Sequence, residues 1–74
     1  MEERIISIIS EITRKPLEYL QQNQTGQKFW DSLQLVEIVL AIEEEFDIMF
    51  YPEEIKDMND LHAILSMVKR KSVE

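Results

Sequence analysis

The sequence predicts an all-α fold, a small four-helix bundle built from three main helices and one short helix. Three observations predict this fold. Apolar residues recur at i, i+3, i+4 and i+7 in three separate segments, which is the spacing of one helix face. Residues that favour helix starts (Asp, Ser, Asn or Pro) precede the later helical segments. The short apolar run at residues 47–51 has no evident strand partner, so we expect a loop there.

The first helix is predicted from Glu2 to about Arg14. Pro16 should end it, because the residue before a proline avoids the helical region. Residues 16–20 have the composition of a further helical turn, and the polar residues 21–28 are predicted to form a loop. The positions of the first helix that should face the core are Ile5, Ile8, Ile9 and Ile12. The aromatic residues expected to close the core after the loop are Phe29 and Trp30.

The central helix is predicted to begin at Asp31 or Ser32, since both are good N-cap residues, and to end near Phe46. Its core-facing stripe is Leu35, Ile38, Val39, Ile42 and Phe46. Leu33 and Leu40 fall on a different face, among acidic residues. Two interpretations of that face are open. It docks a basic partner, or the leucines border the core and the acids are simply solvated.

The C-terminal third of the chain is predicted to contain a short helix and a long one. Ile48 and Phe50 should enter the core from the loop at residues 47–51. Pro52 opens the short helix, from Glu53 to about Asp57, because proline suits the first turn. Asn59 or Asp60 should cap the last helix, with Met58 packing back on it, and residues 72–74 should fray. The core stripe of the last helix is Leu61, Ile64, Leu65 and Val68.

Length and charge limit the possible functions. The 74 residues allow one domain, 1–74, and the absence of cysteine excludes disulfides and thiolate metal sites. A net charge of −7 argues against nucleic-acid binding and favours basic protein partners. The sequence contains no run of about 18 apolar residues that could span a membrane. The N-terminus does not have the pattern of a signal peptide. We expect a cytoplasmic monomer.

Ser32 is the only residue on which the sequence suggests a reaction. The single histidine, His62, lies in the last helix, and no Gly-x-Ser-x-Gly motif is present, so a hydrolase is not indicated. The acidic residues do not follow the EF-hand spacing, and we expect no metal site. Ser32 is therefore either a plain helix cap or a residue that another protein modifies. No catalytic residue is predicted, and the protein is not expected to be an enzyme.

A longer pattern resembles a known family. Asp31-Ser32-Leu33, followed by Val36-Glu37 and by the acidic run from Ala41 to Phe46, is similar to the signature of acyl carrier proteins. The resemblance extends to the Pro52-Glu53-Glu54 segment. It implies a four-helix bundle in which Ser32 carries 4′-phosphopantetheine, taken from coenzyme A by a phosphopantetheinyl transferase. Asp31 would contact that transferase.

The resemblance also implies two groups of binding residues. The face that partner enzymes recognise would contain Leu33, Glu37, Leu40, Glu43 and Glu44. The partners would be the transferase and the acyl-loading and acyl-transfer enzymes, with basic docking patches. The residues aligned with those that shelter the acyl chain in some members are Val36, Val39, Phe50, Ile55, Met58 and Ile64. These six residues are equally compatible with an ordinary hydrophobic core.

The expected function is that of an acyl carrier protein. It would present acyl groups as thioesters to enzymes of fatty-acid biosynthesis or of a specialised acyl or polyketide-type pathway. Phe29-Trp30, where many members have a glycine, and Gln34, where an acid is frequent, favour the specialised role. Two alternatives remain, a carrier of aminoacyl or peptidyl groups and an unmodified acidic adaptor that only binds other proteins.

Overall fold

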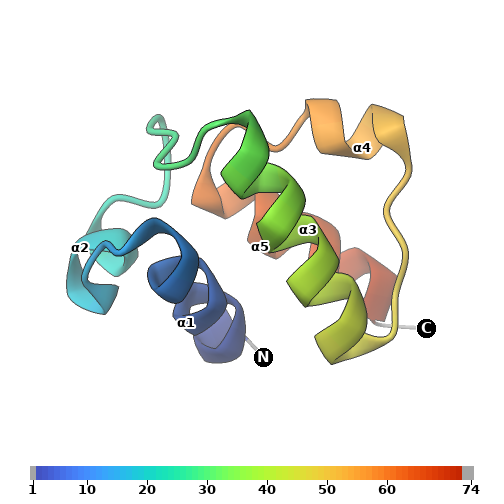
Figure 1. The fold of residues 1–74 in the computed structure, drawn as a ribbon, viewed down its shortest axis with the longest axis horizontal. Coiled ribbons are helices and arrows are strands. Elements are labelled where there is room, and N and C mark those ends of the chain that lie inside the picture. Colours follow the sequence, from blue (N-terminus) through green and yellow to red (C-terminus); the bar gives the residue numbers. More distant parts are fainter. Residues whose placement is uncertain (1, 73–74) are drawn as a thin grey trace.

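The computed structural model describes residues 2–72, and within that range the chain forms five α-helices and no strand (Figure 1). They are α1 (Glu2–Thr13), α2 (Leu17–Gln22), α3 (Ser32–Phe46), α4 (Pro52–Lys56) and α5 (Leu61–Ser72). The predicted all-α class is confirmed. The six-residue α2 is an additional helix, longer than the turn expected at residues 16–20. Of the three residues predicted to fray, Ser72 is the last of α5, and residues 73–74 lie outside the described residues.

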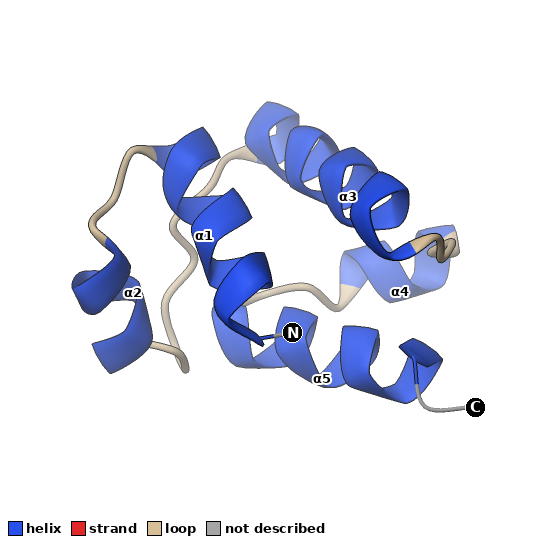
Figure 2. Cartoon of the chain, turned by 90° about the horizontal axis from the view of Figure 1, so that it is seen from below, coloured by secondary structure: helices blue, strands red, loops and turns tan. Residues whose placement is uncertain are grey.

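Helix α1 lies at the centre of the arrangement. It contacts α2, α3 and α5, and Figure 2 shows it beside the other two long helices, α3 and α5. The short helices α2 and α4 lie at opposite ends of the molecule in both views. The loop at residues 47–51 connects α3 to α4 and faces away from α2 (Figure 1).

Helix α1 ends one residue earlier than predicted. Arg14 adopts a left-handed conformation with φ of 66°, and its N–H donates to the Ser10 carbonyl at 2.8 Å. The Thr13 hydroxyl donates to the Ile9 carbonyl at 2.7 Å, so the last turn is closed locally before Pro16. Ile6 is buried in addition to the predicted Ile5, Ile8 and Ile9, and Ile12 is half-buried.

The polar loop after α2 is tied to the start of α5. Gly26, at φ of 78°, donates its N–H to Asp60 Oδ2 at 2.9 Å, and His62 N–H donates to the Gln24 carbonyl at 2.8 Å. Asp60 Oδ1 accepts from the Ala63 N–H at 2.9 Å, so Asp60 is the cap of α5. The N–H of Gly26 and then that of Ala63 lower the pKa of the Asp60 carboxyl below its usual value.

The hydrophobic core joins all three long helices and the loops between them. The predicted stripes supply most of it, and Trp30 and Phe50 close it from the loops as expected. Ile48 packs against it and is half-buried. The core residues with no exposed surface are Ile5, Ile9, Leu20, Ile38, Ile42, Leu61, Ile64 and Val68.

Candidate functional site

The site begins with the cap of α3. Asp31 has extended backbone angles, and its Oδ1 accepts from the Gln34 N–H at 2.8 Å. Gln34 Oε1 accepts from the Asp31 N–H at 3.2 Å, which completes a reciprocal capping box. The Asp31 carbonyl accepts from the Leu35 N–H at 2.9 Å, as the first bond of the helix. Asp31 is therefore the cap, and Ser32 is the first helical residue.

Ser32 is exposed at the amino end of α3. Among the hydrogen bonds of residues 2–72, none involves its hydroxyl, its N–H or the N–H of Leu33. The capping box thus satisfies the amide of Gln34 and leaves the two preceding amides as free donors. Two free amides and the positive end of a helix dipole stabilise a phosphate attached there. The residues present fit a phosphodiester on the Ser32 hydroxyl.

An apolar and acidic surface follows Ser32 along α3. Leu33 is 70% exposed and Leu40 is 59% exposed, and Glu37 and Glu44 are exposed on the same helix. Val36, which resemblance places among the residues that shelter an acyl chain, is 53% exposed. It lies three residues after Leu33 and four before Leu40, so the three side chains form one exposed row. Val36 belongs to the outer surface of α3 and not to the core.

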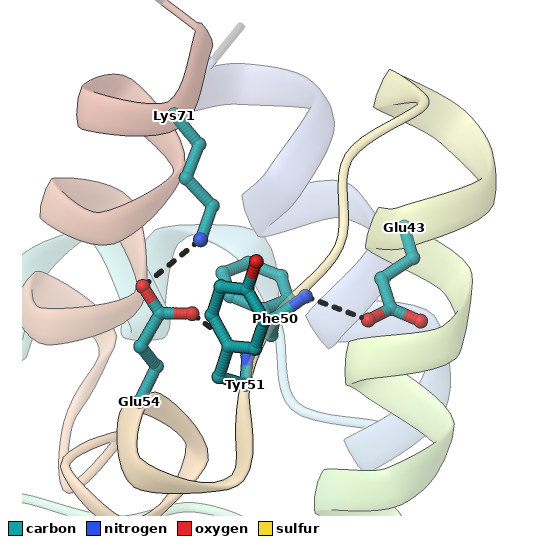
Figure 3. Close-up of polar contacts among 5 residues, drawn as sticks. All are labelled: Glu43, Phe50, Tyr51, Glu54 and Lys71. Carbon is teal, nitrogen blue, oxygen red and sulfur yellow. Dashed lines mark hydrogen bonds and ion pairs between the residues drawn. The ribbon is translucent and has the colours of Figure 1, made fainter.

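Glu43 is not exposed as Glu37 and Glu44 are. It is half-buried, and its Oε2 accepts from the Phe50 N–H at 2.9 Å (Figure 3). This bond fastens the loop at residues 47–51 to the side of α3. The carboxylate of Glu43 therefore positions the loop, and the acids that a partner can reach directly on α3 include Glu37 and Glu44.

The same loop is held from its other side by α4 and α5. Glu54 Oε1 accepts from the Tyr51 N–H at 2.8 Å, and Glu54 Oε2 pairs with Lys71 Nζ at 2.9 Å. The Lys71 ammonium lies 5.5 Å from the centre of the Phe50 ring and 5.3 Å from that of Tyr51 (Figure 3). The Tyr51 N–H and then the Lys71 ammonium lower the pKa of the Glu54 carboxyl below its usual value.

The sequence does not predict the contacts of Lys71 with Glu54 and the two aromatic rings. The sequence assigns Lys69, Arg70 and Lys71 equally to the end of the last helix, and only the packing of α5 distinguishes Lys71. Glu54 had a local signal, because an acid three residues after a helix cap is typical of a capping box. Tyr51 is the residue at that cap position.

The other five residues of the implied acyl pocket belong to the core. Val39, Phe50, Met58 and Ile64 are buried, and Ile55 is half-buried against them. A groove of about 530 Å³ lies elsewhere, between α1 and α3. None of the six pocket residues lines it.

Residues 2–72 contain no group of three or more His, Cys, Asp or Glu side chains placed to hold a metal ion. None of the helices α1 to α5 is both long and apolar enough to cross a membrane.

Comparison with known proteins decides the family. The chain is 32% identical over 74 residues to the acyl carrier protein of Buchnera aphidicola subsp. Schizaphis graminum, an alignment that covers 97% of this chain and 94% of that protein. The chain belongs to the acyl carrier protein family. The resemblance seen in the Asp31-Ser32-Leu33 motif is confirmed.

Two more relatives match over shorter lengths. The acyl carrier protein of Buchnera aphidicola subsp. Acyrthosiphon pisum is 36% identical over 44 residues, which is 60% of this chain and 55% of that protein. The acyl carrier protein homolog of Mycoplasma pneumoniae is 38% identical over 39 residues, which is 53% of this chain and 46% of that protein. No family model matches the chain. Acyl carrier proteins are carrier proteins rather than catalysts.

Proposed function

We propose that this chain carries acyl groups as thioesters on a 4′-phosphopantetheine arm attached to the Ser32 hydroxyl. The observation that supports the proposal is the geometry of Ser32. It is the exposed first residue of a capped helix, and neither its own N–H nor that of Leu33 has a hydrogen-bond partner among residues 2–72. When bound, the arm supplies a terminal thiol to which an acyl group is joined. The chain itself anchors the phosphate and presents it to other enzymes.

Partner recognition is assigned to the exposed surface of α3. Leu33, Val36 and Leu40 offer an apolar strip, and Glu37 and Glu44 lie beside it with their charge in solvent. A partner with an apolar contact surrounded by basic residues would fit this combination, and the net charge of −7 would speed the encounter. The partners proposed are a phosphopantetheinyl transferase and acyl-loading and acyl-transfer enzymes. The pathways proposed are fatty-acid biosynthesis or a specialised acyl or polyketide-type pathway.

Mass spectrometry tests the attachment. The unmodified protein is incubated with coenzyme A and a phosphopantetheinyl transferase of broad specificity, and the intact mass is measured. We expect one arm on the natural chain and none on Ser32→Ala. The matched control is Ser66→Ala, which changes a half-buried serine of α5 and should still accept one arm.

Two results would reject the proposal. One is a natural chain that stays unmodified while a known acyl carrier protein is modified in the same reaction, which would favour an unmodified adaptor. The other is an arm that persists on Ser32→Ala. The group on the arm is identified separately, by the mass of the protein purified from its native host, and an aminoacyl or peptidyl group there would favour the alternative carrier.

A further inference from the structure

A groove between α1 and α3 has no role in the function proposed so far. Its volume is about 530 Å³, and it opens to solvent along the two helices. Residues from α1 and from the second half of α3 line it: Arg4, Ile8, Glu11, Ile12, Ala41, Glu44 and Glu45. Of these, Glu44 alone was expected from the sequence to bind partners.

The groove has an apolar floor and an acidic rim. Ile8 is 5% exposed, and Ile12 and Ala41 are half-buried, so the floor is formed by aliphatic groups. The rim carries three exposed carboxylates, those of Glu11, Glu44 and Glu45, against one guanidinium.

The single cation of the rim, Arg4, forms an ion pair with Glu45. Arg4 Nε lies 3.2 Å from Glu45 Oε2, and a terminal nitrogen of Arg4 donates to Glu45 Oε1 at 3.2 Å. This two-point pair leaves Glu11 and Glu44 without an ion-pair partner among residues 2–72. The two remaining carboxylates therefore repel an anionic ligand and favour a cationic one.

The position of the groove separates it from Ser32. Ala41 follows Ser32 by nine residues, about 14 Å along the helix axis. At about 100° per residue, nine residues also place Ala41 on the side of α3 opposite Ser32. A molecule that fills the groove therefore leaves the serine and the start of α3 uncovered.

We infer that the α1–α3 groove is a docking site for a basic amphipathic helix of a partner protein. Its apolar residues would rest on Ile8, Ile12 and Ala41, and its Lys or Arg side chains would reach Glu11 and Glu44. The inference extends the proposed carrier function. Glu44 also belongs to the recognition surface proposed on α3, whereas Ser32, Leu33 and Val36 do not line the groove. A partner bound here would therefore leave the start of α3 accessible, so the groove provides for tethering and not for acyl transfer.

The test uses a synthetic helical peptide of about 14 residues, roughly 21 Å long. Leucines lie along one face and arginines border it. A second peptide has the same composition in scrambled order. Each is titrated into isotope-labelled Ser32→Ala protein, and amide chemical shifts are followed by NMR. Because Ser32→Ala cannot carry the arm, the result is independent of the proposed function.

We expect the largest shifts in α1 and the second half of α3, and weaker binding of the scrambled peptide. Glu11→Gln with Glu44→Gln should weaken the helical peptide about fivefold, as expected for the loss of two exposed charge contacts. The control, Glu18→Gln with Glu53→Gln, makes the same change of net charge on exposed residues of α2 and α4 and should alter binding less than twofold.

Three results would overturn the inference. They are equal weakening by both double variants, equal binding of both peptides, and shifts that centre on Leu33 and Leu40. A separate measurement tests the tethering. With the natural chain saturated by peptide, arm addition at Ser32 should keep its rate, and a rate that falls as the groove fills would show that the two sites overlap.

Discussion

The two ends of α3 are held in different ways. At the amino end the cap is local, since Asp31 and Gln34 bond to each other within four residues of chain. One contact reaches farther along the chain, since the Gln34 side-chain amide donates to the Ile12 carbonyl at 3.4 Å. At the carboxyl end, Glu43 of α3 accepts a hydrogen bond from the loop that leads to α4. Glu54, which pairs with Lys71, accepts a hydrogen bond from the same loop on its other side.

The contrast explains why Ser32, at the amino end of α3, is exposed to solvent. A cap built from neighbouring residues needs no other helix to cover it, so Ser32 stays accessible. The opposite end has a local cap as well, in which the Asp47 and Ile48 N–H groups donate to the Glu43 carbonyl. In addition, it is packed by residues from three helices and by the buried ring of Phe50. The amino end therefore leaves Ser32 uncovered, and the carboxyl end is fixed by contacts between distant segments.

Phe50→Ala should have the largest effect on stability. Removing a buried aromatic ring lowers the free energy of unfolding by about 3–5 kcal/mol. Leu33→Ala, at the exposed amino end, should change it by no more than about 0.5 kcal/mol. Urea unfolding followed by circular dichroism measures both. Similar losses for the two variants would contradict the contrast between the ends.

Asp31→Ala should have an intermediate effect. It removes the cap of α3 and should lower the free energy of unfolding by about 0.5–2 kcal/mol. Asp31→Asn keeps a side-chain oxygen that caps well and should restore most of that loss. If Asp31 also contacts the transferase through its charge, Asp31→Asn will still slow arm addition, and normal rates would limit Asp31 to capping.

Lys71→Met should lower the melting temperature by a few degrees. The substitution keeps the aliphatic contact and removes the charge that faces Glu54 and the two aromatic rings. Lys69→Met is the control, because the Lys69 side chain is 61% exposed and that of Lys71 is 19% exposed. Differential scanning calorimetry measures both melting temperatures. An equal decrease in the two variants would show that the Lys71 charge does not stabilise the loop.

The smallest predicted effect depends on pH. The pKa values of Glu54 and Asp60 are lowered in the folded chain, so the unfolded chain takes up protons first as the pH falls. Their contribution is complete above the unfolded pKa values and is lost as the pH falls through the folded ones. Stability should therefore decrease below about pH 4, and less steeply in Asp60→Asn. Urea titrations at several pH values measure the slope, and an unchanged slope would contradict this role for Asp60.

The sequence predicts α3 well because its signals are local. A cap residue, a periodic apolar stripe and the motif at Ser32 all lie within the helix itself. Val36, which the resemblance places among residues that shelter an acyl chain, is instead exposed in one row with Leu33 and Leu40. The sequence also defines the stripes of α1 and α5, but α2 exceeds the predicted turn.

The contacts that sequence reasoning could not supply join distant segments. Glu43 differs from Glu44 because the loop returns to one side of α3 and α1 packs on the other. Lys71 meets Tyr51 twenty residues away, and Asp60 meets Gly26 across the fold. Such pairs depend on the packing of helices and leave no periodic pattern in the sequence.

Trp30 is a natural fluorescent probe close to Ser32. It is the sole tryptophan, it lies two residues before Ser32, and it is 4% exposed. Its indole N–H has no hydrogen-bond partner among residues 2–72. Fluorescence from one indole thus reports on the segment that leads into Ser32. Its emission will shift to the red on denaturation, so unfolding can be monitored without attaching a dye.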